Sequence, residues 1–353
     1  MLGRNIGIDL GTTSIIVYLE GKGIIMSEPS VVAYRKTTGK IIAVGRKAYD
    51  MVGKESRSVE VIRPMREGVV SDFSVTEQML RYFIRNICKN EIFKPNIIVS
   101  MPGTVTNLER RTILDVITAS GAGKACLMEE PLAAAIGAGV DTMQPNGVMI
   151  VDLGGGTTDV AVITMGSMAV ASSIKVAGNT LNESIEKYCR RERNVLIGDQ
   201  TAEELKRVLG AAYRRREQVA MIAKGKDYIS GMPVEFEINS DEIYYCIREN
   251  VRSIVEAVTN VLERTPPELA GDIMEEGIIL TGGTALLLGL DKVIEEATHI
   301  HTRIADDPVN CVARGIGAVL GDLDILVNNG YLFMSRQDIS GVTNEEKEDY
   351  FDV

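Results

Sequence analysis

The apolar positions of this chain recur with two different periods. Short apolar runs at residues 6–8, 97–99, 148–151 and 277–280 predict buried strands, and residues 30–34 predict a further strand. Apolar side chains three and four residues apart predict helices over residues 74–87, 106–117, 205–212 and 242–263. Ser74, Thr106 and Thr201 each stand three residues before a glutamate, a spacing that predicts a capping box at the start of a helix.

Two further helices are predicted from their small residues. Glu130-Pro131 opens a helix over residues 132–138, whose alanines would let two domain bodies pack closely, and a glycine-rich helix follows at residues 308–320. Beyond it, residues 337–353 carry six acidic residues and one lysine, so we expect a solvated terminus there.

One phrase occurs twice in the chain. Residues 8–13 read I-D-L-G-T-T, residues 151–159 read V-D-L-G-G-G-T-T-D, and each copy lies between two apolar runs. This is the pattern of a β-hairpin with a turn of glycine and hydroxyl residues. Glycine lets backbone N–H groups approach an anion, so such a turn can hold phosphate, and a neighbouring carboxylate suits hydrated Mg²⁺. A single copy is equally well explained as an ordinary glycine turn, but two copies predict half-domains that share one nucleotide.

Composition narrows the function classes. At 353 residues the chain is long enough for two domains, and its net charge of −11 argues against nucleic acid as a partner. The five cysteines are scattered and lack a Cys-x-x-Cys pair, as expected for reduced thiols in a cytoplasm. The first residues lead directly into a strand, so no signal peptide is expected, and no apolar run reaches the ~20 residues of a membrane span.

Several motifs together resemble the actin-like ATPase superfamily and, within it, the bacterial actin MreB family (MreB/Mbl-like). The similarity extends over residues 5–325. The motifs that carry it are D-L-G-T at 9–12, E-P-S at 28–30, I-R-P-M-R-E-G at 62–68, E-R-R at 109–111, E-E-P-L-A-A-A-I-G at 129–137, residues 152–159, T-P-P-E-L at 265–269 and L-T-G-G at 280–283.

The resemblance implies an α/β fold, the actin-like (ribonuclease H-like) two-domain ATPase fold, with a nucleotide cleft between the domains. Domain I would span residues 1–144 with an inserted subdomain at about 31–72, and domain II residues 145–325 with an insert at about 179–240. Residues 326–353 would form a C-terminal tail. Family members bind ATP and Mg²⁺ and polymerise into filaments that pair antiparallel on the inner face of the cytoplasmic membrane. There they maintain cell shape, with cell-shape or membrane proteins as further partners.

The resemblance also assigns roles to single residues. Asp9 and Asp152 would hold Mg²⁺ through water, and Glu130 would orient the attacking water. Simpler roles are a turn carboxylate for each aspartate and a helix-dipole contact for Glu130. Thr158 and Asp159 are second candidates for positioning water or metal. The phosphate- and nucleoside-binding residues would be Gly11, Thr12, Thr13, Gly154, Gly155, Gly156, Thr157, Glu203, Lys206, Arg207, Gly282 and Gly283, with Thr157 also catalytic.

The membrane contact is expected at Ile92 and Phe93, which lie between Lys89 and Lys94. The alternative is that these two side chains pack in the core at a helix end. Glu203, Lys206 and Arg207 equally fit a solvated charged helix face. A metal site at His299 and His301 is not expected, because no further ligand lies at the right spacing.

Three functions remain open on the sequence. The favoured one is a nucleotide-switched polymer with slow ATP hydrolysis coupled to assembly. The second is a soluble small-molecule kinase of the same superfamily. The third, a chaperone-type ATPase, lacks a peptide-binding domain after residue 325.

Overall fold

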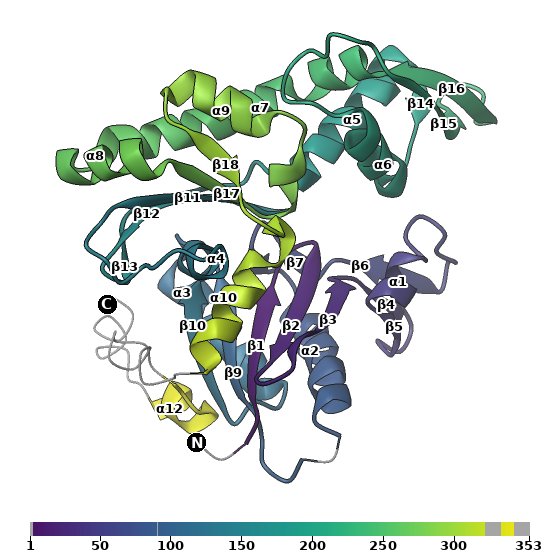
Figure 1. Cartoon of the computed structure of the whole chain (residues 1–353). Coiled ribbons are helices and arrows are strands. Elements are labelled where there is room, and N and C mark those ends of the chain that lie inside the picture. The colour runs from purple at the N-terminus through teal and green to yellow at the C-terminus, as the bar shows by residue number, and fades with distance from the viewer. Residues whose placement is uncertain (1–2, 90, 322–332, 342–353) are drawn as a thin grey trace. The chain divides into compact units, whose positions relative to one another are not determined.

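Each of the two repeated hairpins forms part of its own five-stranded sheet. In this computed structural model, which describes residues 3–89, 91–321 and 333–341, the chain folds into two compact units (Figure 1). The first unit contains Met1–Gln144, Met165–Ser167 and the chain from Val309, and the second contains Pro145–Thr164 and Met168–Pro308.

The first sheet has the strand order β10-β9-β1-β2-β3. Its strands are β1 (Asn5–Leu10), β2 (Ser14–Leu19), β3 (Gly23–Pro29), β9 (Asn96–Met101) and β10 (Lys124–Glu129). β1 pairs antiparallel with β2 and parallel with β9, and β9 pairs parallel with β10. Parallel neighbours need long crossovers, and these are the helices α2 (Phe73–Ile87) and α3 (Asn107–Ala119).

The second sheet repeats this plan with the order β13-β12-β11-β17-β18. Its strands are β11 (Val148–Leu153), β12 (Thr158–Thr164), β13 (Ser167–Ile174), β17 (Ile278–Thr281) and β18 (Thr302–Ile304). Again the two hairpin strands, β11 and β12, pair antiparallel. β11 also pairs parallel with β17, and β17 pairs parallel with β18. The duplicated phrase in the sequence therefore corresponds to a duplicated sheet topology.

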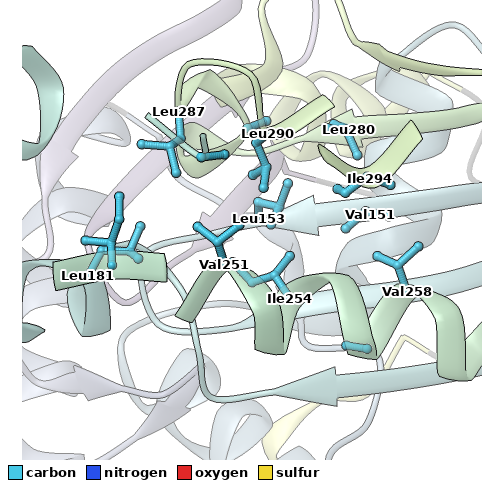
Figure 2. Packing of buried hydrophobic residues seen from close by; sticks show 14 of the residues in the cluster. Val151, Leu153, Leu181, Val251, Ile254, Val258, Leu280, Leu287, Leu290 and Ile294 are labelled. Carbon is cyan, nitrogen blue, oxygen red and sulfur yellow. The ribbon is translucent and has the colours of Figure 1, made fainter. Parts of the chain in front are cut away.

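The core of the second unit lies between this sheet and the long helix α7 (Ser240–Arg264). Figure 2 shows Val251, Ile254 and Val258 of α7 close to Val151 and Leu153 of β11. All five side chains are at most 3% exposed, and burying such side chains contributes about 1.5–3 kcal/mol each. After α7, this unit continues with the helices α8 (Pro267–Glu276), η1 (Gly283–Leu286) and α9 (Leu290–Thr298), and η2 (Pro308–Asn310) begins at its last residue.

Each unit also carries a smaller sheet within a predicted insert. In the first unit β5-β4-β6 pack with α1, and β7 and β8 form a short hairpin. The elements are β4 (Val32–Arg35), β5 (Ile41–Val44), α1 (Arg46–Tyr49), β6 (Val59–Ile62), β7 (Met65–Arg66) and β8 (Val69–Val70). In the second unit the sheet β14-β15-β16 lies beside α5 and α6. These elements are α5 (Gly178–Glu192), β14 (Val195–Leu196), α6 (Asp199–Leu209), β15 (Ala220–Asp227) and β16 (Pro233–Asn239).

The predicted helix starts are only partly right. The capping box of Thr106 and Glu109 is confirmed, because each side chain bonds the backbone N–H of the other. The prediction for Ser74 is wrong: α2 begins after Asp72, whose carboxylate accepts from the Val75 N–H at 2.9 Å. Thr201 also does not cap a helix, because α6 begins two residues earlier, after Gly198. The strand predicted at 30–34 is confirmed as β4, and a further strand, β3, precedes it in the chain.

The small-residue helix α4 (Glu130–Gly137) packs against α10 (Cys311–Leu320) inside the first unit, not between two domain bodies. A Cβ on Gly137 would lie 1.8 Å from the Cys311 carbonyl oxygen, and one on Gly315 would lie 1.8 Å from that of Ala133. The two backbones are therefore in direct contact. This contact also explains why the second unit ends at Pro308 and not at the predicted residue 325.

The C-terminal prediction is wrong for residues 334–341. Met334 exchanges two backbone hydrogen bonds of 2.8 Å with Ala125 of β10, and α12 (Arg336–Gly341) follows it. Met334 and Ile339 are 8% and 4% exposed and join the core of the first unit. Two backbone hydrogen bonds and two buried apolar side chains thus attach residues 334–341 to the first unit. The other parts of the predicted tail, 326–332 and 342–353, lie outside the described residues.

Candidate functional site

The first hairpin turn is a tight backbone loop. The Gly11 N–H donates to the Ser14 carbonyl oxygen at 3.0 Å, and a Cβ on Gly11 would lie 2.8 Å from that oxygen. The buried Thr12 hydroxyl accepts from the Gly68 N–H at 2.9 Å, while Thr13 is exposed. The Thr12 hydroxyl therefore fixes the loop after β7, and it retains its own proton for a further acceptor.

Three polar side chains meet where the parallel strands of the first sheet end. Asp9 lies near the end of β1, Ser100 near the end of β9, and Glu130 directly follows β10. The Ser100 hydroxyl lies 3.1 Å from Asp9 Oδ1 and 3.3 Å from Glu130 Oε1, and it accepts from the Leu10 N–H at 3.1 Å. One buried hydroxyl thus connects the two carboxylates that the sequence assigns to metal and water.

These carboxylates lie in a poorly solvated environment. Glu130 is 8% exposed. Burial raises the pKa of Asp9 from 3.8 to about 6, and the hydrogen bond from Ser100 opposes this only in part. A desolvated carboxylate without a cation is unfavourable, so this edge of the sheet is suited to a cationic ligand.

In the second hairpin, the carbonyl groups of the turn are bonded to neighbouring elements. The Gly154 oxygen accepts from the Thr284 hydroxyl at 2.8 Å and from the Gly178 N–H at 3.2 Å. The Gly155 oxygen accepts from the Asn179 N–H at 2.8 Å. In a trans peptide the next N–H points opposite to the carbonyl. The N–H groups of Gly155 and Gly156 therefore point away from α5, and neither has an acceptor among the described residues.

Two such N–H groups form an anion-binding turn. Thr157 and Asp152 beside them are 7% and 6% exposed. The Asp152 carboxylate accepts from the Thr281 hydroxyl at 2.7 Å, which fixes its orientation at the end of β11.

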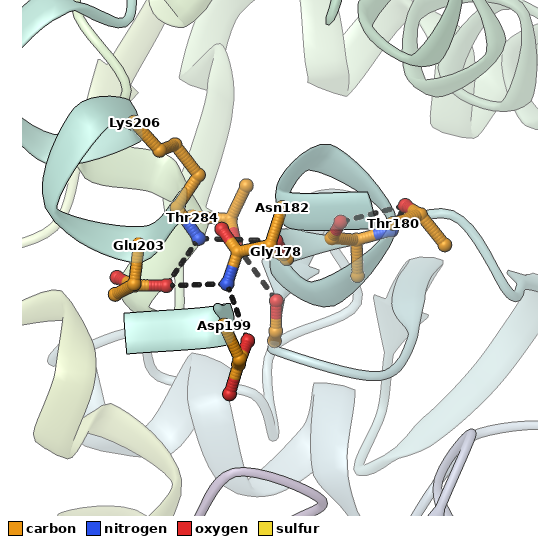
Figure 3. A network of polar contacts seen from close by, with 9 residues as sticks. Gly178, Thr180, Asn182, Asp199, Glu203, Lys206 and Thr284 are labelled. Atoms are coloured by element: carbon orange, nitrogen blue, oxygen red, sulfur yellow. Dashed lines mark hydrogen bonds and ion pairs between the residues drawn. The ribbon is translucent and has the colours of Figure 1, made fainter. Parts of the chain in front are cut away.

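The charged residues of α6 form a network with the N-terminal end of α5 (Figure 3). Lys206 Nζ donates to the Gly178 carbonyl oxygen at 3.0 Å and to Glu203 Oε2 at 2.7 Å. Asn182 also donates to Glu203 Oε2, at 3.0 Å. The Lys206 side chain is only 12% exposed, so a solvated charged face does not describe it. It supports the second hairpin from behind, because Gly178 itself bonds the Gly154 oxygen.

Arg207 and the two glycines of the Thr-Gly-Gly motif differ in what surrounds them. Arg207 is exposed. Gly282 has φ +80°, and a Cβ there would lie 2.3 Å from the Leu153 carbonyl oxygen, so this position requires glycine for packing. Gly283 is exposed, with no atom within 4 Å of a Cβ built on it. Of the two glycines, Gly283 therefore has the space to contact a ligand.

The carboxylates of the second hairpin fit a magnesium ion held through water. Asp152 and Asp159 are directly opposite in the β11–β12 register, so their side chains leave the sheet on the same face. Within the described ranges, no group of three or more His, Cys, Asp or Glu residues could hold a metal on its own. Mg²⁺ needs no such cage, because it keeps several waters and uses one or two carboxylates with phosphate oxygens.

The comparisons with known proteins agree with this geometry. The family model described as MreB/Mbl protein matches residues 3–328. The chain belongs to the MreB/Mbl family. It is 44% identical to the cell shape-determining protein Mbl of Bacillus subtilis over 329 residues, which are 92% of this chain and 98% of that protein. It is 42% identical to the cell shape-determining protein MreB of Escherichia coli K12, over 94% of this chain and 97% of that one.

A solved structure gives the same result for the fold. MreB5 of Spiroplasma citri bound to ADP is 37% identical and superimposes with a TM-score of 0.88, covering 93% of this chain and 99% of that one. The predicted actin-like two-domain fold is thereby confirmed, and the chain is a bacterial actin homologue. The small-molecule kinase alternative is not supported by this membership of the MreB/Mbl family.

The predicted membrane residues lie in the loop between α2 and β9. Ile92 is 93% exposed and Phe93 is 54% exposed, so core packing at a helix end does not account for them. No helix among the residues described is both long and apolar enough to cross a bilayer.

Sequence reasoning did not predict the bonds to the two hairpins that three residues make, although Thr281 belongs to the L-T-G-G motif. Ser100, Thr281 and Thr284 bond residues of the two hairpins, and their partners Asp9, Asp152 and Gly154 lie 91, 129 and 130 residues away. A serine inside an apolar strand and a threonine at a strand end are common, so the only signal was their place at the carboxyl ends of parallel strands.

Proposed function

We propose that this member of the MreB/Mbl family is an ATPase that assembles into filaments on the inner face of the cytoplasmic membrane and helps to maintain cell shape. Slow ATP hydrolysis would be coupled to assembly. The names of the Mbl and MreB relatives and the ADP bound to MreB5 support this proposal. The chain's location would then be cytoplasmic and peripheral to the membrane.

The observation that carries the nucleotide part is the second hairpin turn. The carbonyl groups of Gly154 and Gly155 are bonded to α5 and Thr284, which leaves the N–H groups of Gly155 and Gly156 for a phosphate. The first turn, Gly11-Thr12-Thr13, would contact the β- and γ-phosphates of the same nucleotide. N–H donors held in fixed positions stabilise the negative charge on the phosphate oxygens in the transition state of phosphoryl transfer.

The nucleoside would lie against the second unit. Glu203 is oriented by Lys206 and Asn182, so its second oxygen can accept from a ribose hydroxyl. Arg207 and Gly283 are exposed and can approach the base and the α-phosphate. Gly282 and Lys206 would act indirectly, by holding the Thr-Gly-Gly loop and the hairpin in place.

Asp9 and Asp152 would each hold a water of the magnesium ion, with Asp159 beside Asp152. The ion, when bound, neutralises phosphate charge. Thr157, at the end of the turn, would help to place the γ-phosphate.

Glu130 would accept a hydrogen bond from the attacking water. As the water oxygen forms its bond to the γ-phosphorus, the bond from phosphorus to the bridging oxygen breaks and the water's proton passes to the Glu130 carboxylate. The products are ADP and phosphate. Ser100 keeps Glu130 in place by its hydrogen bond, so it is a positioning residue in this scheme.

Membrane attachment would use Ile92 and Phe93. Burying such a side chain contributes about 1.5–3 kcal/mol, which is weak for one protomer but adds along a filament. This accounts for attachment without a membrane-spanning helix.

High-speed sedimentation tests the proposal. The wild-type protein with ATP should pellet above a critical concentration, and Glu130→Ala should pellet as well but lose about 99% of phosphate release. The matched control is Glu204→Ala, an exposed glutamate on α6 that should behave as wild type. A protein that remains in the supernatant at every concentration would rule out the polymer, and unchanged hydrolysis in Glu130→Ala would rule out the assigned water contact.

A further inference from the structure

A cavity of about 500 Å³ lies beside the exposed loop Ile92-Phe93. Its walls are the last turns of α2, the loop that follows, and residues 119–121 at the end of α3. In Figure 1 this region is at the lower end of the first unit, where α2 leads into the loop. Ile92 and Phe93 belong to the cavity lining and are also the most exposed apolar side chains of the loop.

The cavity is basic although the whole chain has a net charge of −11. Four cationic side chains line it: Arg81, Arg85, Lys89 and Lys94. Its one carboxylate, Glu91, is paired with Arg4. The cavity therefore has an excess of positive charge.

Among the residues that the structure describes, Arg81 alone of the four cations is bound to another group of the protein. Arg81 pairs with Glu77 and donates to the Ala119 carbonyl oxygen at 2.8 Å. Arg85, Lys89 and Lys94 are exposed, and none has an ion pair or a side-chain hydrogen bond within residues 3–89 and 91–321.

A simpler role exists for part of this charge. Cations in the last turn of a helix interact favourably with its dipole, which accounts for Arg85 and, two residues past the end of α2, for Lys89. It does not account for Lys94, which lies in no helix and precedes β9 by two residues. The helix dipole therefore does not explain the positive charge of Lys94 at the end of the loop.

We propose that this cavity binds the phosphate of an anionic phospholipid headgroup while Ile92 and Phe93 enter the acyl layer. The inference rests on the membrane attachment proposed above and adds the class of lipid. Lysine and arginine donors form strong charge-assisted hydrogen bonds with phosphate oxygens. Cations and apolar side chains on one loop match the two parts of a phospholipid, its headgroup and its chains.

Co-sedimentation of ATP-assembled protein with vesicles tests this. One set of vesicles is phosphatidylcholine alone, and one contains phosphatidylglycerol, whose net negative charge is on its phosphate. The third contains oleate at the same surface charge, so that its net negative charge is on a carboxylate. Each basic residue at an anionic surface contributes about fivefold to binding. Wild type should therefore favour phosphatidylglycerol over phosphatidylcholine by on the order of a hundredfold, and favour it over oleate as well.

The variant is Arg85→Gln with Lys89→Gln and Lys94→Gln. It should lose the preference for phosphatidylglycerol yet bind phosphatidylcholine as wild type does. The matched control changes Lys22, Lys40 and Lys47 to Gln, three exposed lysines of the same unit without ion pairs among the described residues. The control has the same net charge and should retain the preference. Thermal unfolding and sedimentation without vesicles verify that both variants fold and assemble.

The outcomes separate this inference from the proposed function. Equal binding to phosphatidylglycerol and oleate vesicles, or an equal loss in the control, overturns the phosphate site and leaves membrane attachment standing. If the wild type binds no vesicle at all, or Phe93→Ser binds phosphatidylcholine as well as wild type does, the attachment itself fails and the lipid site with it.

Discussion

Ser100 is the residue on which the first half of the site depends. Its hydroxyl lies within 3.3 Å of both Asp9 and Glu130, and it satisfies the Leu10 N–H. It is 2% exposed, so water does not substitute for it easily. The sequence assigned functions to both carboxylates but could not indicate the side chain that holds them, because a contact over 91 residues has no local pattern.

Ser100→Cys should lower the ATP hydrolysis rate about tenfold while nucleotide affinity changes less than about twofold, because the residue positions Glu130 and does not touch the nucleotide. A thiol keeps the shape of the side chain but is a weak hydrogen-bonding group. Single-turnover hydrolysis and nucleotide titration measure the two quantities. A loss of affinity with normal hydrolysis would contradict the positioning role.

Asp9 should make stability depend on pH in magnesium-free buffer. Its pKa is raised from 3.8 to about 6, so the folded protein binds a proton that the unfolded chain releases in this range. Stability should therefore fall as pH rises from about 4 to about 6 and then stay level. Asp9→Asn lacks this proton and should be more stable above pH 6 by about 1–2 kcal/mol, a value reduced because the mostly buried Asp9 keeps some contact with solvent. Urea unfolding of wild type and Asp9→Asn over this pH range measures the free energy of unfolding. Equal free energies of unfolding at pH 7 would refute the prediction.

At the scale of elements, strands and long helices were predictable while helix starts were not. The apolar run at 97–99 and the helical spacing in 242–263 correspond to β9 and α7. Asp72 precedes α2 in place of Ser74, because several side chains near a helix start can accept the first N–H groups, whereas Gly198 precedes α6 in place of Thr201 without any side-chain cap. The contact between α4 and α10 could not be predicted for another reason. Glycine and alanine side chains are too small to form a recognisable apolar repeat along the sequence.

The contact of α4 with α10 should not tolerate one added methyl group. In Gly315→Ala the new Cβ would overlap the Ala133 carbonyl oxygen, and two helix backbones would have to separate. We expect a loss of about 3 kcal/mol or more and a melting temperature lower by several degrees. The control is Gly271→Ala in α8, where nothing lies within 4 Å of a Cβ, and it should gain up to about 1 kcal/mol from helix propensity. Thermal unfolding compares the melting temperatures of Gly315→Ala and Gly271→Ala. Equal melting temperatures would disprove the packing argument.

For the whole molecule, the duplicated hairpin was the strongest guide. It predicted two units with matching sheets, and the motifs then indicated the family. The prediction for the C-terminus was wrong at Met334 and Ile339, because these two apolar side chains join the core of the first unit. The net charge of a segment therefore does not predict whether single apolar side chains in it pack in the core.

Net charge should control assembly. Protomers with a charge of −11 repel one another, so raising NaCl from about 50 to about 200 mM should lower the critical concentration severalfold by screening. Vesicle binding through the basic cavity should weaken in the same series, which serves as an internal control. Light scattering follows assembly, and a critical concentration that rises with salt would show that ion pairs dominate the filament contacts.

The glycine contact between α4 and α10 also has a consequence for how this sequence can diverge. Gly137 and Gly315 lie far apart in the chain, yet a Cβ at either position would overlap the backbone of the opposite helix. Neither position can accept a larger residue unless the opposite helix moves, and Glu130 is on one of those helices. Relatives should therefore retain glycine at both positions, or change both together, even where the surrounding residues drift freely.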